Sequence, residues 1–334
     1  VNSQNPVKTV GIIASPSAGK DVRRLVGHAG STGDVDKIAV IRRAALGVVE
    51  SGIDRIMFLD DTKHLIQRAL EAIPQGDVVM EPIEQAVMGN GRDSEKAAAA
   101  LEKAEAGAVI VFGGDGTNRD VAKGWANVPL VPLSVGTNNV FPFHMESTIG
   151  GIAAGLVARG EIPLQEVAER TKIIKVNLAN GETDLALVDL VLVEGDFIGS
   201  RAIWDVSNLK EGVFAIAESS TVGLSSIAAT LKTIRREDDV GIHVEMGTGT
   251  QTVRAPIAPG TYETVHIRSH RELALGETIT INGPGVLAFD GERDYVLSED
   301  QKVTAFITRE GPWVINTQRA MDLANMNNYF VTST

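Results

Sequence analysis

The run Ala-Val-Ile-Val-Phe at residues 108–112 passes directly into Gly-Gly-Asp-Gly-Thr at residues 113–117, and a helix is predicted to follow. A short apolar strand, a glycine turn and a helix in this order are typical of a βαβ unit. Glycines let backbone amides approach a phosphate closely, and a helix N-terminus presents unpaired N–H groups and the positive end of its dipole. The turn therefore predicts a phosphate-binding site at the end of a strand.

The single acid of this turn, Asp115, needs an explanation of its own, because a phosphate repels a carboxylate. Beside a phosphate, an acid is useful when it contacts a metal ion or accepts a proton from an attacking hydroxyl. The turn as a whole therefore predicts phosphoryl transfer. The alternative is a purely structural glycine turn, which is common after a strand.

Length and composition limit the fold and the partners. The chain has 334 residues, more than a single core usually holds, so two domains are expected. Its net charge is −12, from 43 acidic and 31 basic residues, which disfavours a nucleic-acid groove or a membrane surface as partner. The absence of cysteine excludes disulfides and thiolate zinc sites. With no signal peptide or transmembrane run in the sequence, a cytoplasmic protein is expected.

Apolar periodicity divides the chain near residue 165. Residues 1–165 alternate strands with amphipathic helices and predict an α/β nucleotide-binding domain with a Rossmann-like parallel sheet. Residues 166–334 contain successive strands and predict a β-sandwich that binds substrate, with a C-terminal tail that either stays there or returns to the first domain.

The boundaries of these elements are also predicted. In the first domain, strands are expected at 10–13, 55–59, 77–80, 108–112 and 130–135, and helices at 35–49, 94–106, 117–126 and 147–157. Thr117 is the expected N-cap of the third helix. The buried stripe of the first helix is predicted from spacing to contain Val35, Ile38, Ile41 or Arg42, Leu46 and Val49. In the second domain, one helix at 219–235 interrupts the strands, and its charged end at 235–239 is expected to be solvated.

Two further loops of the first domain follow predicted strands. Gly-Thr-Asn-Asn at residues 136–139 ends the strand at 130–135, so it lies at the same sheet edge as the first turn, where α/β sheets bind ligands. Its polar groups suit a sugar hydroxyl, a base edge or a phosphate, and the alternative is an Asn-rich entry to a helix. The loop at 14–20 has the spacing of a P-loop, but Asp21 stands where Ser or Thr should bind magnesium. Ser17, Gly19 and Lys20 therefore remain candidates for an auxiliary phosphate contact.

Three acids of the second half are candidates for the same site. Asp290 and Glu292 flank a glycine between two apolar runs, which is typical of a hairpin turn. If the domains face each other, these acids can instead hold magnesium or substrate hydroxyls. Asp189 lies within the apolar run 185–193, where a carboxylate is costly unless it is paired or functional, or unless that side of the strand faces solvent. His266 and His270 lie on a predicted strand and form no metal cluster.

Taken together, residues 15–19, 113–117, 136–139 and 290–292 resemble, in order and spacing, the superfamily of NAD kinases and diacylglycerol/sphingosine kinases. A more specific similarity, around 12–24 and 113–142, is to the branch called acetoin catabolism protein X. The resemblance implies an α/β nucleotide domain, a β-sandwich and a cleft between them. It implies ATP and Mg²⁺ as cofactors and Asp115 as the acid that activates the acceptor hydroxyl. The residues that it assigns to the nucleotide are Gly113, Gly114, Gly116, Thr117, Asn118, Gly136, Thr137, Asn138 and Asn139.

Two positions depart from the pattern of the superfamily. Ser15 stands where lipid kinases have Asn, and the strand with Asp189-Leu190 lacks the Asn-Glu pair with which NAD kinases hold the dinucleotide. We therefore expect an ATP-dependent kinase whose acceptor is either a dinucleotide such as NAD or a small metabolite linked to acetoin catabolism. A homo-oligomer is expected from exposed strand edges and from family habit. The alternative is a nucleotide-binding sensor of the same fold without transfer chemistry.

Overall fold

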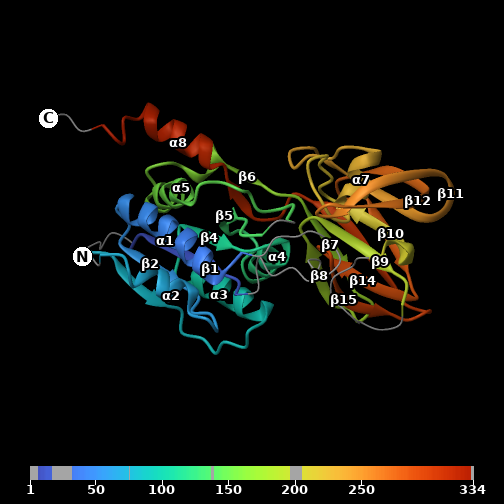
Figure 1. Ribbon diagram of the computed structural model, residues 1–334, viewed down its shortest axis with the longest axis horizontal. Helices are drawn as coiled ribbons and strands as arrows, with labels where there is room; N and C mark the ends of the chain where they lie inside the picture. Colours follow the sequence, from blue (N-terminus) through green and yellow to red (C-terminus); the bar gives the residue numbers. More distant parts are fainter. Residues whose placement is uncertain (1–6, 17–31, 75, 137–138, 196–204, 332–334) are drawn as a thin grey trace.

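The computed structural model describes residues 7–16, 32–74, 76–136, 139–195 and 205–331. Helices and strands alternate on one side of the molecule, and antiparallel strands make up the other side (Figure 1). The α/β sheet has seven strands in the order β3-β2-β1-β4-β5-β17-β6 and is parallel except for β6. Its strands are β1 (Thr9–Ala14), β2 (Arg55–Phe58), β3 (Val79–Pro82), β4 (Ala108–Phe112), β5 (Pro129–Leu133), β6 (Ala168–Arg170) and β17 (Trp313–Ile315).

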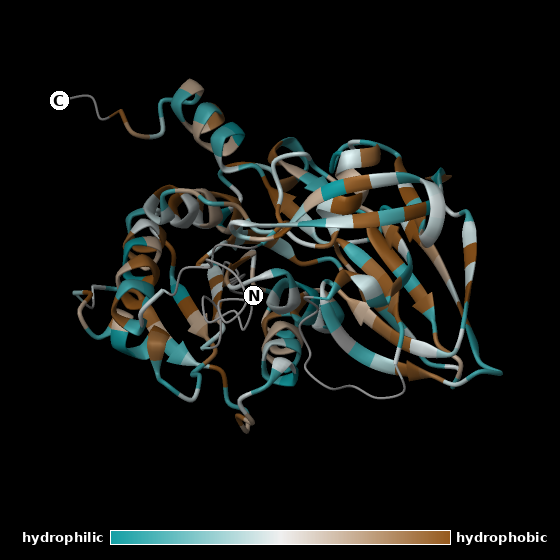
Figure 2. Cartoon of the chain, turned by 45° about the vertical axis from the view of Figure 1, so that its right-hand side comes forward, coloured by the Kyte–Doolittle hydropathy of each residue, from teal (hydrophilic) through white to brown (hydrophobic). Residues whose placement is uncertain are grey.

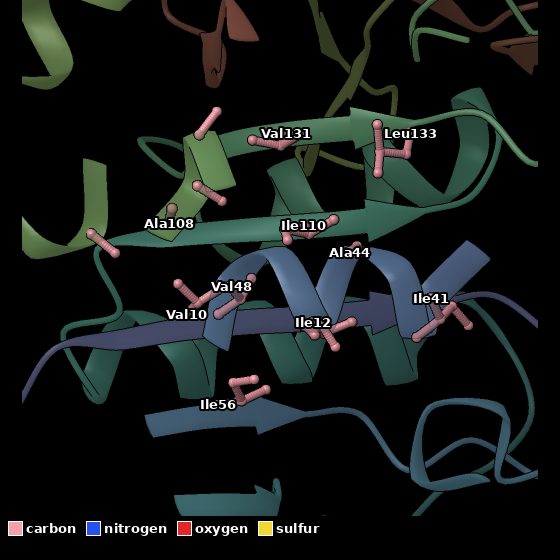
Figure 3. Close-up of a cluster of buried hydrophobic side chains, with 14 of the residues drawn as sticks. Val10, Ile12, Ile41, Ala44, Val48, Ile56, Ala108, Ile110, Val131 and Leu133 are labelled. Atoms are coloured by element: carbon pink, nitrogen blue, oxygen red, sulfur yellow. The ribbon is translucent and has the colours of Figure 1, made fainter. Parts of the chain in front are cut away.

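Helices cover both faces of this sheet, and the central strand β4 shows why its sequence is apolar throughout. Ile110 of β4 packs into a core with α1, α2, α5 and α8, whereas the next residue, Val111, packs into a second core with α3 and α4. Figure 3 shows the first of these cores, where Ile12 and Ile110 lie on the face of the sheet that α1 crosses. The helices are α1 (Asp34–Glu50), α2 (Leu65–Leu70), α3 (Gly91–Lys103), α4 (Asp115–Gly124), α5 (Ser147–Arg159), α6 (Leu164–Val167) and α8 (Thr317–Met326). A strand buried on both faces needs no polar alternation.

The buried face of α1 differs from the predicted stripe. Val35 is 76% exposed and Leu46 is 43% exposed, so the prediction that these two residues are buried is wrong. The face instead includes small residues, because α1 packs closely against α5. A Cβ added to Gly47 would lie 2.3 Å from the Thr148 carbonyl oxygen, and one added to Gly151 would lie 2.0 Å from that of Ala44. Counting only large apolar residues missed this close contact between the two helices.

The second part contains two antiparallel sheets packed face to face. The six-stranded sheet has the order β12-β11-β10-β9-β14-β15, and the four-stranded sheet has the order β13-β16-β7-β8. The strands are β7 (Ile173–Asn177), β8 (Thr183–Ala186), β9 (Asp189–Val193), β10 (Leu209–Phe214), β11 (Val240–Ala258), β12 (Thr261–Ala274), β13 (Thr278–Asn282), β14 (Gly285–Phe289), β15 (Glu292–Leu297) and β16 (Lys302–Thr308). Leu192 and Val213 of the larger sheet share a core with Ile281 and Ile307 of the smaller one. The predicted fold class, a parallel α/β sheet followed by a β-sandwich, is confirmed.

The outer face of the larger sheet is covered in part by α7 (Ser225–Leu231), whose Ile227 packs on Val191 and Phe214. The long strands β11 and β12 carry bands of hydrophobic and hydrophilic residues (Figure 2). The helix predicted at 219–235 is much shorter than expected, and the strand predicted at 77–80 lies at 79–82. None of the helices in the described ranges is long and apolar enough to span a bilayer.

The end of the chain lies against the α/β sheet. Strand β17 is inserted between β5 and β6, and α8 packs beside α5 (Figure 1). The Tyr329 hydroxyl donates to the carbonyl oxygen of Ser51 at 3.1 Å and accepts from Arg159 at 2.8 Å. These bonds join the C-terminal segment to the ends of α1 and α5, which lie 278 and 170 residues earlier in the chain.

Candidate nucleotide site between the two sheets

The glycine turn lies at the carboxyl end of β4, and α4 begins inside it. Helix α4 starts at Asp115 with Gly114 as its N-cap, so the predicted N-cap, Thr117, is wrong. Thr117 lies inside the first turn of the helix and packs against the glycine turn, where a Cβ on Gly113 would lie 2.5 Å from the Thr117 Cβ. Asn118, which is fully buried, donates from Nδ2 to the Gly114 carbonyl oxygen at 2.8 Å. The Asn118 Oδ1 has no hydrogen-bond partner within the described residues.

The Asp115 side chain bridges the two polar turns of the sheet edge. Its Oδ1 accepts from the N–H of Val140 at 3.0 Å and from the N–H of Phe141 at 2.8 Å, and Oδ2 lies 3.1 Å from the Val140 nitrogen. This acid therefore has a structural role, which the sequence did not indicate. The two N–H groups occupy both acceptor positions of Oδ1, so a proton would have to be accepted by Oδ2.

The second predicted turn adjoins the first. Asn139 donates from Nδ2 to the Ser134 hydroxyl at 2.9 Å, and a Cβ on Gly114 would lie 2.7 Å from its Oδ1. Ser134 in turn donates to the Gly136 carbonyl oxygen at 3.1 Å. The structure thus brings Gly113, Gly114, Asp115, Gly136 and Asn139 together. Two other predicted members of this turn, Thr137 and Asn138, lie outside the described residues.

The loop after β1 reaches the same edge. The Ser15 N–H donates to the Phe112 carbonyl oxygen at 3.0 Å, directly before the glycine turn. The buried Lys37 Nζ of α1 donates to the Pro16 carbonyl oxygen at 3.2 Å. The candidates Ser17, Gly19 and Lys20 lie outside the described residues, so the auxiliary phosphate contact stays a prediction.

The three candidate acids of the second part occupy different positions. The carboxylate of Asp290 is buried and accepts from the N–H groups of Leu187, Val188 and Asp189, which explains this acid without a ligand. Burial raises the pKa of Asp290. Asp189 is also buried, at the start of β9. Glu292 is exposed, and its Oε1 lies 3.6 Å from the position of a Cβ on Gly116.

Glu292 is thus the second-part acid that faces the glycine turn. Its carboxylate would be in ordinary van der Waals contact with a Cβ built on Gly116, so this acid of the second part lies directly beside the third glycine of the turn. Among the described residues, no group of three or more His, Cys, Asp or Glu side chains could hold a metal ion. Any magnesium here would need ligands from the nucleotide.

Arg119 of α4 connects the glycine turn to the second part, and sequence reasoning missed it. Its guanidinium donates to Asp184 at 2.7 Å, to Asp294 at 3.2 Å and to the Leu185 carbonyl oxygen at 2.6 Å. It also lies 4.5 Å from the centre of the Phe289 ring. The sequence did contain one signal of a buried arginine. Arg119 lies on the face of the helix that also buries Val121 and Ala122.

Arg236 makes a second connection, and the prediction of a solvated helix end at 235–239 is wrong for this residue. Its guanidinium donates to the carbonyl oxygens of Val140 and Phe141 and lies 4.4 Å from the centre of the Phe143 ring. The charge run at 235–239 gave no sign of this contact, because its partners lie about a hundred residues earlier.

Asp120, one turn after Gly116 on α4, has a raised pKa of about 7. Burial is the largest cause, the nearby Glu292 and Glu95 raise the pKa further, and Arg119 and Lys123 lower it. Between pH 3.8 and about 7 the folded protein therefore binds more protons here than the unfolded chain. The free energy of unfolding falls as pH rises through this window, and above pH 7 the cost of the charged form is fully present.

Asp120→Asn is expected to stabilise the protein at pH 8 by about 1–2 kcal/mol, since each pKa unit corresponds to about 1.4 kcal/mol and solvent screens a half-buried group. At pH 5 the gain should be smaller, because the acid there is mostly protonated. Urea unfolding at both pH values measures the difference, with the exposed Asp77→Asn as the control. An equal effect at both pH values would contradict the raised pKa.

Comparison with known proteins agrees with this arrangement. Residues 34–162 match the ATP-NAD kinase N-terminal domain, and residues 172–310 match the acetoin catabolism protein X C-terminal domain. The acetoin catabolism protein X of Cupriavidus necator is 33% identical over 311 residues, which cover 88% of this chain and 86% of that protein. Yeast NADH kinase, solved in complex with NADH, has the same fold, with a TM-score of 0.55 at 14% identity over 99% of this chain and 90% of that one. By its sequence, the chain belongs to the acetoin catabolism protein X family.

Proposed function

We propose that this chain is an ATP-dependent phosphotransferase that acts on a hydroxyl of a dinucleotide such as NAD or of a small metabolite linked to acetoin catabolism. The observation that carries the proposal is the position of the glycine turn. It opens α4 at the carboxyl edge of the parallel sheet, and its third glycine lies next to an acid of the other part, Glu292, whose Oε1 is 3.6 Å from the position of a Cβ on Gly116. Polyphosphates bind at such edges because backbone N–H groups and the helix dipole point toward them.

The residues have separate roles in this proposal. The backbone of Gly113, Gly114 and Gly116 binds the phosphates of ATP, with Thr117, Asn118, Gly136 and the residues 137–139 nearby. Asp115 accepts the proton of the acceptor hydroxyl as its oxygen attacks the γ-phosphorus. The bond from that phosphorus to the bridging oxygen breaks, and ADP leaves. Magnesium bound with the nucleotide would neutralise the phosphate charge. Glu292, which lies beside Gly116, would orient the acceptor from the side of the second part.

Incubation of the purified protein with Mg²⁺ and γ-labelled ATP tests this proposal. The candidate acceptors are NAD, NADH, acetoin and butanediol, and we expect label to be transferred to one of them. Omitting the acceptor is the control for simple ATP hydrolysis. ATP binding without any labelled product would contradict the kinase.

A specific observation favours a second candidate, a nucleotide-binding sensor without transfer chemistry. Asp115 holds the peptides of Val140 and Phe141, so the acid is useful to the fold even when no reaction takes place. Tight ATP binding that alters the association of the protein, with no turnover on any acceptor, would support the sensor.

We also propose a cytoplasmic homo-oligomer that does not bind membranes. Light scattering tests the oligomeric state, and sedimentation with anionic liposomes tests membrane binding.

A further inference from the structure

A peptide group connects Asp115 in the first part to Arg236 in the second. The N–H of the Val140–Phe141 peptide donates to Asp115 Oδ1 at 2.8 Å, and the carbonyl oxygen of the same peptide accepts from Arg236 Nη2. The next carbonyl oxygen, that of Phe141, accepts from Arg236 Nη1 at 2.6 Å. An anion and a cation therefore act on opposite ends of one peptide dipole, and each strengthens the hydrogen bond of the other by polarising that peptide.

The Arg236 guanidinium is held in place from several directions. It lies 4.4 Å from the centre of the Phe143 ring, and its Nε lies 3.6 Å from Glu218 Oε1. Its side chain is 20% exposed. Burial lowers the pKa of this guanidinium, and the charges of Glu218 and Asp115 act in the opposite direction. An arginine stays charged under these conditions, so its guanidinium N–H groups remain hydrogen-bond donors.

The backbone that presents Arg236 is equally constrained. Lys172 Nζ donates to the carbonyl oxygens of Arg235 at 2.9 Å and Val240 at 2.7 Å. Arg309 Nη1 donates to the carbonyl oxygen of Arg236 itself at 3.2 Å. The turn between α7 and β11 is therefore fixed to the four-stranded sheet before it reaches across to the first part.

We propose that Arg236 is a positioning residue for Asp115, and that the second part of the protein thereby completes the acid of the first. Arg236 fixes the Val140–Phe141 peptide, and this peptide fixes the carboxylate. The proposal rests on the proposed function for its catalytic consequence, but the coupling between the two side chains exists whether or not the protein is an enzyme.

The coupling is tested by amide hydrogen exchange of Val140 and Phe141 in the full chain. Arg236→Gln should speed exchange of both amides about 10- to 100-fold, the loss typical of a hydrogen bond to a charged group. Arg236→Lys should keep part of the protection of both amides from exchange, because a single ammonium group then replaces the two guanidinium nitrogens that donate to the carbonyl oxygens. Arg235→Gln is the matched control, since the Arg235 side chain is exposed beside it. Unchanged exchange in Arg236→Gln would overturn the proposal.

Turnover gives an independent measurement. If Asp115 is the base, Arg236→Gln should lower kcat about 10- to 100-fold with little change in the KM for ATP, because a misplaced catalytic group slows the reaction without weakening binding. Adding Arg236→Gln to Asp115→Asn should then cost little more, since both act on one step. If the losses in kcat of the two substitutions were fully additive, Arg236 would not act through Asp115, and the proposal would be overturned. Normal turnover of Asp115→Asn with fast exchange in Arg236→Gln would reject the base but keep the coupling.

Discussion

Asp115→Asn is expected to lower turnover about 10²- to 10⁴-fold, the range that a positioned general base supplies. The affinity for ATP should change little. This substitution separates chemistry from structure because Asp115 Oδ1 accepts from both Val140 and Phe141, and an amide oxygen in the same place can accept from both. The variant therefore keeps an acceptor for both N–H groups and loses the charge and the basic group. Single-turnover transfer from γ-labelled ATP and a separate ATP titration measure the two quantities.

Asp115→Ala is the informative comparison, because it also removes the acceptor of the two N–H groups. A buried donor without a partner costs about 1–3 kcal/mol, so this variant should be less stable and should bind ATP more weakly. Asp77→Asn, at an exposed position, controls for the loss of one negative charge. If Asp115→Asn keeps full turnover and Asp115→Ala alone is impaired, the acid is structural and the sensor becomes the better interpretation.

The sequence predicted what local patterns determine. The apolar run at 108–112 has only one sensible structure, a strand buried on both faces, and three glycines after it indicate a close approach of backbone to other atoms. The N-cap of α4 was not predictable in this way. Thr117 has the residue type of a cap, but the helix begins at Asp115, whose carboxylate contacts peptides 25 residues later in the chain. Pairings across that distance leave no periodic signal in the sequence.

The contacts between the two parts show the same limit more strongly. Arg119 and Asp294 are 175 residues apart, and Arg236 contacts carbonyl groups, which every residue has. Charge patterning alone made the run 235–239 look like a solvated surface. Glu292 was predicted as a candidate from its motif, yet only the fold shows that it faces Gly116 while its neighbour Asp290 is used inside its own domain. A motif indicates residue types, and the packing of the domains decides which of them reach the site.

Arg119→Met is expected to lower the free energy of unfolding by about 3–5 kcal/mol, the usual cost of removing one partner from a buried ion pair. Arg119 is 8% exposed and faces Asp184, which is 13% exposed, and Asp294, which is 41% exposed. Its positive charge also opposes the burial that raises the pKa of Asp290. Methionine fills much of the same volume, so the loss reflects charges and hydrogen bonds and not a cavity.

The two partners of Arg119 provide a graded control for this prediction. Asp294→Asn should cost no more than about 1 kcal/mol, because solvent already screens an exposed acid. Asp184→Asn should cost more, because Asp184 is less exposed than Asp294 and also pairs with Lys123 at 3.0 Å. Urea unfolding of the three variants, followed by fluorescence and circular dichroism, gives the order. An Arg119→Met variant no less stable than Asp294→Asn would mean that this arginine does not hold α4, and with it the glycine turn, against the second part of the protein.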